Sequence, residues 1–227
     1  MARLILVTGD KGGVGKSFLA RALLDWKLAQ SAAIQAFDTD KTNSTLFRFY
    51  PSHVQHLDLE CTEELDGLLE RFKTQDVFLL DCAARTLDIF LKWAEGVDLL
   101  ECQKQLSFQI TLAFVLGPEK DCISILKDVF HRFQSGVDYA LILNQAKGCD
   151  FSLYQNSNTR KLLLESHQAL EWEMPALFEK TVRVLDRLNL SFDQAVGNAE
   201  VQLADQSRVR LFREKMKTLF SKGNLWN

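Results

Sequence analysis

The sequence predicts an α/β fold in which a mostly parallel, twisted sheet is flanked by helices on both faces. Short apolar runs alternate along the chain with segments whose apolar residues recur at helical spacing. Several of these runs are continuous rather than alternating, which is typical of strands buried on both faces. The chain has 227 residues, 47% of them apolar, which suits one large domain. We therefore expect residues 1–227 to form a single domain.

Strands and helices are predicted in alternation along most of the chain. Predicted strands are short apolar runs bounded by polar or turn residues, and they cover 4–7, 32–37, 54–59, 76–81, 108–116, 137–144 and 169–175. Predicted helices cover 18–30, 62–73, 87–93, 97–106, 160–166, 177–190 and 200–221, with a further helix through Ile123, Leu126, Val129 and Phe130. The last strand runs into Pro175, which favours an edge position. Residues 147–158, rich in Gly, Ser and Asn, predict a linker.

The composition argues against several classes of protein. No stretch approaches the roughly 20 apolar residues of a membrane-spanning helix, and the first residues lack the pattern of a signal peptide. Five cysteines are widely spaced without a C-x-x-C pair, so we expect buried free thiols in a cytoplasmic protein. His53 and His56 have no acidic or cysteine neighbour, which argues against a metal site there.

A glycine-rich loop lies between the first predicted strand and the first predicted helix. Residues 9–17 read Gly-Asp-Lys-Gly-Gly-Val-Gly-Lys-Ser. In this context the loop's backbone N–H groups turn toward phosphate oxygens, and the helix N-terminus adds partial positive charge. Lys16 would reach the β- and γ-phosphates, and the Ser17 hydroxyl would bind Mg²⁺. The strict pattern G-x-x-x-x-G-K-[ST] is not met, because Asp10 occupies its first position, and Lys11 is an additional lysine.

Carboxylates follow two predicted strands. Residues 38–40, Asp-Thr-Asp, end the second strand, and Asp81 ends the apolar run 77–80. Ligands of parallel sheets bind at the carboxyl ends of strands, and a carboxylate after such a run can orient Mg²⁺ through a water. The polar residues 42–45 could place hydroxyls near the γ-phosphate. Alternatively, they form a connection whose Asp and Ser cap a helix.

Together these motifs resemble the ParA/MinD family of deviant Walker A P-loop ATPases, in order and over nearly the whole chain. The resemblance implies ATP and Mg²⁺ as ligands, with Ser17, Asp38 and Asp81 around the metal. It implies nucleotide contacts from Gly12, Gly13, Val14, Gly15, Lys16, Ser17, Phe18, Asn144, Pro175 and Ala176. Asn144 would read the adenine edge, while Pro175 and Ala176 would offer backbone contacts beside the base. Residues 82–86 would be switch II, although Ala83-Ala84-Arg85 departs from the family's usual residues there; Arg85 either senses the γ-phosphate or pairs with a surface carboxylate.

The resemblance also implies a mechanism, a nucleotide-sandwich homodimer. Lys11 of one subunit would reach the phosphates bound in the other and supply the charge that an arginine finger supplies elsewhere. The implied catalytic residues are Lys11, Lys16 and Asp40, and Asp40 would position the attacking water. ATP binding would favour the dimer, and hydrolysis, stimulated by a protein partner, would release it.

The C-terminal segment is basic. Residues 201–227 hold six basic and two acidic residues, although the whole chain carries a net charge of −3. Contact with non-specific DNA or with a membrane is expected through Arg208, Arg210, Arg213, Lys215 and Lys217. The alternative is a helix that covers the sheet with a solvated basic face. The predicted function is a ParA-type ATPase in plasmid partition or mobilisation. The alternatives are a MinD-like membrane-positioning ATPase and, disfavoured by the lack of paired cysteines, an ATP-dependent biosynthetic enzyme.

Overall fold

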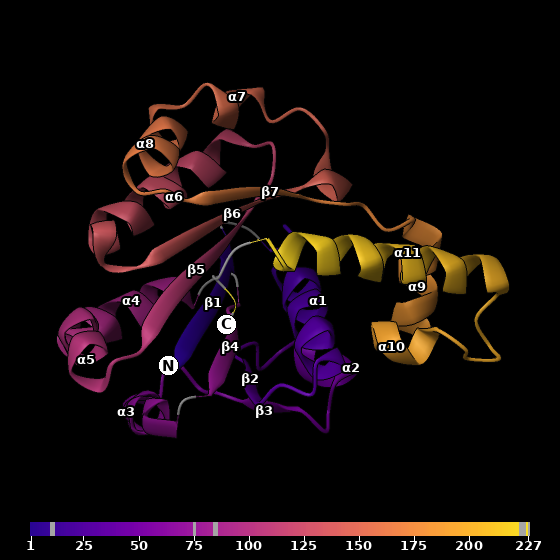
Figure 1. Cartoon of the computed structure of the whole chain (residues 1–227), viewed down its shortest axis with the longest axis horizontal. Helices are drawn as coiled ribbons and strands as arrows, with labels where there is room; N and C mark the ends of the chain where they lie inside the picture. Colours follow the sequence, from indigo (N-terminus) through magenta and orange to yellow (C-terminus); the bar gives the residue numbers. More distant parts are fainter. Residues whose placement is uncertain (10–11, 75, 84–85, 223–225, 227) are drawn as a thin grey trace.

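A computed structural model of the chain describes residues 1–9, 12–74, 76–83, 86–222 and 226. These residues form a seven-stranded sheet in which every neighbouring pair of strands is parallel, in the order β3-β2-β4-β1-β5-β6-β7 (Figure 1). The strands are β1 (Arg3–Gly9), β2 (Ile34–Asp38), β3 (Val54–His56), β4 (Val77–Asp81), β5 (Gln109–Leu116), β6 (Asp138–Asn144) and β7 (Leu170–Met174). The parallel sheet predicted from the sequence is confirmed, and β7 is an edge strand.

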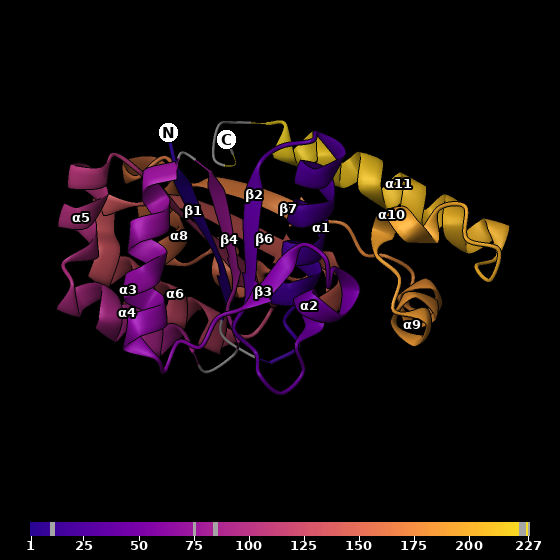
Figure 2. The same ribbon diagram turned by 90° about the horizontal axis from the view of Figure 1, so that it is seen from below.

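Helices cover both faces of the sheet, as predicted. One face carries α3 (Thr62–Arg71), α4 (Leu87–Gly96), α5 (Leu99–Leu106), α6 (Lys120–Phe133), α7 (Ser152–Gln155) and α8 (Asn158–Ser166). The other carries α1 (Lys16–Ala29), α2 (Thr45–Phe49), α9 (Glu179–Leu188), α10 (Phe192–Ala195) and α11 (Leu203–Phe220). Figure 2 shows the two layers on either side of the strands. None of the helices in the described part of the chain is both long and apolar enough to cross a bilayer.

Two hydrophobic cores explain why the central strands are apolar throughout. In β1, Leu4 and Leu6 enter one core, whereas Ile5 and Val7 enter the other. The same alternation holds along β5. Successive side chains of a strand point to opposite faces, so a strand covered on both sides must be apolar at every position. The continuous apolar runs of the sequence therefore mark the middle of the sheet.

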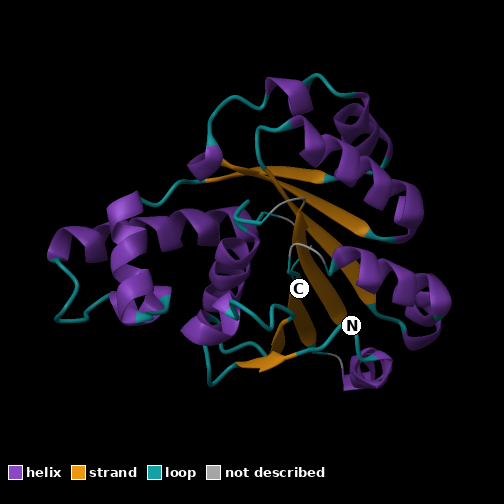
Figure 3. Ribbon diagram, turned by 180° about the vertical axis from the view of Figure 1, so that it is seen from behind, coloured by secondary structure: helices purple, strands orange, loops and turns teal. Residues whose placement is uncertain are grey.

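The C-terminal helix α11 packs on the face that carries α1. Val209, Phe212 and Met216 are buried there, and α9, α10 and α11 extend together to one side of the sheet (Figures 1 and 3). The fully buried Trp226 lies with its ring centroid 5.3 Å from that of Trp172 on β7. The helix is amphipathic, but its apolar side is narrower than the sequence suggests.

An apolar residue of α11 is uncovered, and one predicted loop contains a helix. Leu203, the first residue of α11, is 77% exposed. The predicted linker at 147–158 contains helix α7, whose Tyr154 is fully buried. The Tyr154 hydroxyl donates to Glu171 at 2.8 Å, which ties this polar segment to β7.

The cysteines are free, as expected, but their burial differs from the expectation. Cys82 and Cys122 are buried, whereas Cys149 is exposed and the remaining two are half-buried. Cys149 lies in the connection that precedes α7, where no strand or helix covers it. The wide, irregular spacing of the cysteines in the sequence indicates that they form no disulfides. It carries no information about how deeply each thiol is buried.

Candidate nucleotide-binding site

The glycine-rich loop lies at the carboxyl end of β1, between β4 and β5 in the middle of the sheet. Gly13 and Gly15 have φ angles of +79° and +111°, in the left-handed region that side-chain-bearing residues rarely adopt. A Cβ at Gly9 would lie 2.6 Å from the carbonyl oxygen of Val115. Glycine is therefore required at these positions by backbone conformation and by close approach. The neighbouring Asp10 and the predicted catalytic Lys11 lie outside the described residues.

Helix α1 begins directly after this loop with Lys16 and Ser17. Its N-cap, Gly15, forms no side-chain cap hydrogen bond, and the first turn contains no acidic residue. Helix N-termini carry amide groups without helical partners and partial positive charge, which makes them favourable places for anions. Lys16 is buried and adds a full positive charge at this point. The loop and the helix start therefore form the anion-binding geometry that the sequence predicts.

Asp81 ends β4 beside the loop and is 3% exposed. Its Oδ1 atom has no hydrogen-bond partner among the described residues, while its carboxylate accepts from the Ser17 hydroxyl. Burial raises the pKa of Asp81 to about 7; the negative charge of Asp38 contributes, and the Ser17 hydrogen bond and the Lys16 charge oppose. A divalent cation would supply the missing partner and favour the ionised form. Ser17 and Asp81 therefore fit the Mg²⁺ site that the sequence predicts.

The two aspartates after β2 form hydrogen bonds within their own loop. Asp38 accepts from the backbone N–H groups of Asp40 at 2.9 Å and of Phe47 at 3.1 Å. Its burial raises its pKa, and these hydrogen bonds oppose the shift. Both Asp38 oxygens thus hold the turn that leads into α2, and its role as a metal ligand stays a prediction. The alternative for this loop, a connection whose Asp and Ser cap a helix, holds only in part. Asp38 accepts from Phe47 in α2, whereas the N-cap residue Ser44 forms no side-chain cap hydrogen bond and donates instead to the carbonyl of Asp40.

Asp40 differs from Asp38 in its hydrogen-bond partners and in the direction of its pKa shift. It accepts from the backbone N–H groups of Thr42 and Asn43, each at 2.9 Å. Partial burial opposes ionisation, but these hydrogen bonds outweigh it and hold the pKa below its usual value, with a smaller contribution from the positive charge of Lys16. Asp40 is therefore ionised at neutral pH. An ionised carboxylate near Lys16 can accept a hydrogen bond from a water, so its predicted role is chemically sound.

Asn144 ends β6 and braces the loop. Its Nδ2 donates to the carbonyl of Val14 at 2.7 Å, and its Oδ1 accepts from the N–H of Ala146 at 3.1 Å. A Cβ at Gly15 would collide with this Nδ2 atom. The amide, 3% exposed, thus fixes the backbone of the phosphate loop from the neighbouring strand. The predicted contact of Asn144 with adenine stays a prediction, while this bracing role was not anticipated from the sequence.

The remaining predicted contacts lie around the same loop. The side chain of Met174, the last residue of β7, lies 3.5 Å from the position of a Gly15 Cβ, and Pro175 and Ala176 follow Met174 in the chain. The Phe18 ring packs on Phe192 with a centroid distance of 5.3 Å. Its side chain is therefore part of the contact with the C-terminal helices. A phosphate contact of Phe18 would come from its backbone, and all three contacts stay predictions.

No group of three His, Cys, Asp or Glu side chains within the described ranges is arranged to hold a metal ion by itself. Mg²⁺ demands octahedral oxygen ligands and commonly takes them from one or two protein groups, waters and substrate phosphates. The pair Ser17 and Asp81 fits that mode of binding.

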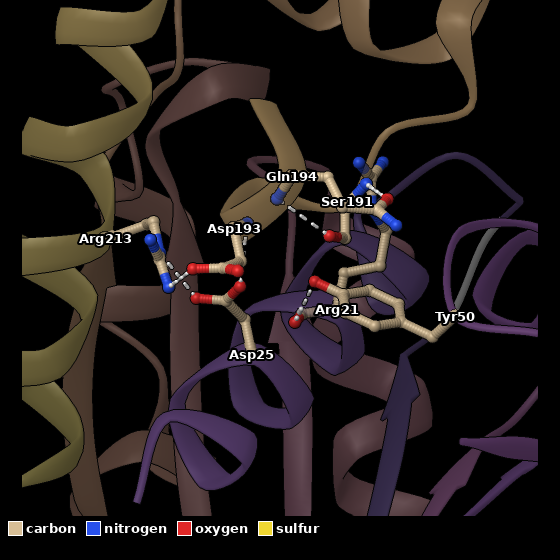
Figure 4. A network of polar contacts seen from close by, with 7 residues as sticks. All are labelled: Arg21, Asp25, Tyr50, Ser191, Asp193, Gln194 and Arg213. Carbon is tan, nitrogen blue, oxygen red and sulfur yellow. Dashed lines mark hydrogen bonds and ion pairs between the residues drawn. The ribbon is translucent and has the colours of Figure 1, made fainter. Parts of the chain in front are cut away.

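The predicted basic surface is smaller than the sequence suggests. Arg213 forms an ion pair with the buried Asp25 at 2.8 Å and a second with Asp193 at 2.9 Å (Figure 4). Arg208 is paired with Asp205 at 2.8 Å. Arg213 therefore attaches α11 to the body of the molecule. Three of the predicted residues are exposed and form no ion pair in the part of the chain that the structure describes: Arg210, Lys215 and Lys217.

The parallel sheet, with helices on both faces and a glycine-rich loop between β1 and α1, matches the P-loop NTPase fold of the MinD and ParA type. Two curated proteins resemble the chain in sequence. Protein MobD from Acidithiobacillus ferrooxidans is 26% identical over 175 residues, which cover 73% of this chain and 74% of that protein. Protein TraL from Escherichia coli is 22% identical over 232 aligned positions, which cover 94% and 95%. No protein-family model matches the chain.

Solved structures show the same fold. The septum site-determining protein MinD from Pyrococcus horikoshii, complexed with Mg-ADP, has a TM-score of 0.58 at 16% identity and covers 97% of this chain and 98% of its own. A plasmid partition protein from Borrelia burgdorferi, bound to AMPPNP, has a TM-score of 0.54 at 18% identity and covers 98% and 99%. Both superpose over nearly the full length of both chains.

Proposed function

We propose that the chain is an ATP-dependent dimerisation switch that acts in plasmid mobilisation or partition. The observation that carries the proposal is the buried Asp81 carboxylate. One of its oxygens lacks a partner, and it accepts from the Ser17 hydroxyl at the start of the phosphate loop. A buried carboxylate so placed is costly unless a cation binds beside it. Mg-ATP supplies that cation, and its phosphates supply the negative charge that complements Lys16 and the start of α1.

The nucleotide is proposed from the solved structures with this fold. They were determined with Mg-ADP in one case and AMPPNP in another, which are adenine nucleotides. MobD and TraL, the relatives in sequence, are proteins of plasmid mobilisation and transfer. This relationship supports a role in plasmid transfer over a metabolic reaction.

The chain's own residues would make three contributions to ATP hydrolysis. The loop and Lys16 bind and orient the phosphates, and their positive charge stabilises the negative charge of the transition state. Asp40, kept ionised by its loop amides, accepts a hydrogen bond from the attacking water. Ser17 and Asp81 would hold Mg²⁺, which when bound neutralises charge on the phosphate oxygens. Lys11 from a second subunit would complete the charge around the phosphates.

The test combines nucleotide binding, turnover and size. Wild type should bind Mg-ATP, hydrolyse it slowly and form a dimer with ATP but not with ADP. Asp40→Asn should dimerise with ATP and lose turnover by on the order of a hundredfold. Lys11→Ala should bind ATP as a monomer, because it lacks the lysine that would reach the partner's phosphates. Its turnover should fall on the order of a thousandfold or more, as expected for loss of a group supplied in trans. If Lys11→Ala dimerises and hydrolyses like wild type, the sandwich mechanism is wrong.

We propose DNA rather than a membrane as the surface that the switch contacts. Phe220 and Trp226, two aromatic residues of the described C-terminal segment, are buried in the protein's own core and are not available to insert into lipid. Arg210, Lys215 and Lys217 remain exposed on α11. Neutralising three phosphates predicts a slope of about −2.7 in log affinity against log salt. Replacing all three residues by Gln should abolish co-sedimentation with DNA, and binding to anionic liposomes instead of DNA would contradict the proposal.

A further inference from the structure

Thr39, the middle residue of Asp38-Thr39-Asp40, is connected to the segment after β4 by its backbone and its side chain. Its N–H donates to the carbonyl of Asp81 at 3.2 Å, and its hydroxyl donates to the same carbonyl at 3.0 Å. The hydroxyl oxygen accepts from the N–H of Ala83 at 2.9 Å. The side chain is therefore used fully, as one donor and as an acceptor.

A further contact extends this connection into the loop after β4. The Thr39 and Thr86 hydroxyl oxygens are 3.3 Å apart, and the Thr86 hydroxyl donates to the carbonyl of Ala83 at 3.1 Å. Thr39 is 4% exposed, so these hydrogen bonds are shielded from competing water. The Thr39 hydroxyl thus joins the end of β2 to Asp81 and Ala83 on the neighbouring strand β4 and the segment after it, with the Thr86 hydroxyl close by.

The Thr39 hydroxyl lies close to two residues of the proposed hydrolysis site, Asp40 and Asp81. Asp40 follows Thr39 in the chain, and Asp81 supplies the carbonyl that Thr39 binds. A pocket of about 190 Å³ opens beside them, with Thr39, Asp40, Ala83 and Thr86 in its wall. The Thr39 side chain therefore connects Ala83 to the residue that directly precedes Asp40.

We propose that Thr39 is a positioning residue that holds Asp40 in register with Asp81 and couples it to Ala83 and Thr86. This inference rests on the proposed function, because it assigns Thr39 a role in orienting the carboxylate that binds the attacking water. Thr39 touches no phosphate in this role. Its hydroxyl determines where Asp40 lies, so it acts on the rate of the chemical step rather than on nucleotide affinity.

Two substitutions separate positioning from packing. Thr39→Val keeps the shape and removes the hydroxyl, while Thr39→Ser keeps the hydroxyl and removes a methyl group. Thr8→Val is the matched control, because the Thr8 hydroxyl is also buried but has no hydrogen-bond partner among the described residues. We expect Thr39→Val to lower kcat by on the order of tenfold to a hundredfold with the Kd for ATP within about twofold. Thr39→Ser should restore turnover, and Thr8→Val should leave it unchanged.

Hydrogen exchange in the presence of Mg-AMPPNP tests the coupling without turnover. Thr39→Val should speed exchange at the amide of Ala83, which loses its acceptor, and at Thr42 and Asn43, which depend on Asp40. Unchanged exchange at Thr42 and Asn43, or equal losses of affinity and turnover, would overturn the inference. If wild type binds ATP without hydrolysing it, the proposed function fails, and faster exchange in Thr39→Val but not Thr8→Val would still support the coupling.

Discussion

Among the carboxylates of the candidate site, Asp81 shows the clearest change in pKa on folding. Burial raises its pKa from 3.8 to about 7. Between these two values the unfolded chain has released the proton that the folded chain retains, so this group reduces stability as the pH rises. The protein without nucleotide therefore carries a carboxylate that becomes unfavourable near neutral pH, and binding of a cation reverses that effect.

The first prediction follows from this pKa. Asp81→Asn cannot ionise, so it should become more stable relative to wild type as the pH rises from about 4 to 7, by up to about 4 kcal/mol. Urea unfolding of both proteins across this range, without nucleotide, measures the difference. A difference that does not vary with pH would show that Asp81 titrates normally. The same variant should lose the stabilisation that Mg-ATP gives to wild type.

Gly15 carries the second prediction. At φ +111°, with Asn144 where a Cβ would lie, Gly15→Ala should break the Asn144–Val14 hydrogen bond and lower the free energy of unfolding by about 1–3 kcal/mol. ATP binding should be lost as well. Gly67→Ala is the control, because Gly67 lies within α3 with open space around it, and alanine there should raise stability by up to about 1 kcal/mol. Equal stability of both variants would contradict the argument.

The sequence could suggest individual residues of the candidate site but not the contacts that join them. Lys16, Ser17 and Asp81 could be proposed from spacing within one loop or strand, and their roles stay predictions. The Thr39–Asp81 and Asn144–Val14 hydrogen bonds join residues 42 and 130 positions apart. Such contacts depend on which strands become neighbours and in what register. No local pattern encodes that information.

Among the elements, the central strands β1, β4, β5 and β6 were predicted well because each contains a short apolar run that is buried on both faces of the sheet. The helices α2 and α10 were missed because they are too short to show periodicity. Each depends on particular hydrogen bonds: Asp38 accepts from Phe47 in α2, and Ser191 and Gln194 form a capping box on α10. Their existence follows from side-chain geometry around the turn rather than from hydrophobic pattern.

The third prediction concerns the attachment of α11. Arg213→Met leaves the buried Asp25 carboxylate without its partner and should lower the free energy of unfolding by about 3 kcal/mol. Arg210→Met, on the exposed side of the same helix, should change it by less than about 0.5 kcal/mol. Adding Asp25→Asn to Arg213→Met should recover part of the loss. Urea unfolding measures all three, and equal effects of the two arginine variants would contradict a structural role for Arg213.

At the scale of the whole molecule, ligand binding should appear as stability. Within the described ranges no metal site is complete without added ligands, so Mg²⁺ alone should raise the melting temperature little. Mg²⁺ with ATP at a hundred times its Kd should stabilise the fold by about 2.7 kcal/mol. Adding EDTA should remove most of that gain. A full shift with Mg²⁺ alone would place the metal at a site other than Ser17 and Asp81.

The whole fold could be inferred as a helix-covered parallel sheet, but the order of its strands could not. That order places β1 between β4 and β5 and so brings the loop beside Asp81. The surface was less predictable than the core. A count of basic residues on α11 cannot show that Arg213 faces Asp25, because this depends on how the helix is rotated against α1 (Figure 4).

Helix α1 joins two distant places in the molecule. Its first residue, Lys16, belongs to the phosphate loop, and Asp25, further along, holds α11. A helix of 14 residues is about 21 Å long and nearly inextensible. One helix therefore contacts the proposed phosphate site at its first turn and, through the Asp25–Arg213 ion pair, the helix that bears Arg210, Lys215 and Lys217.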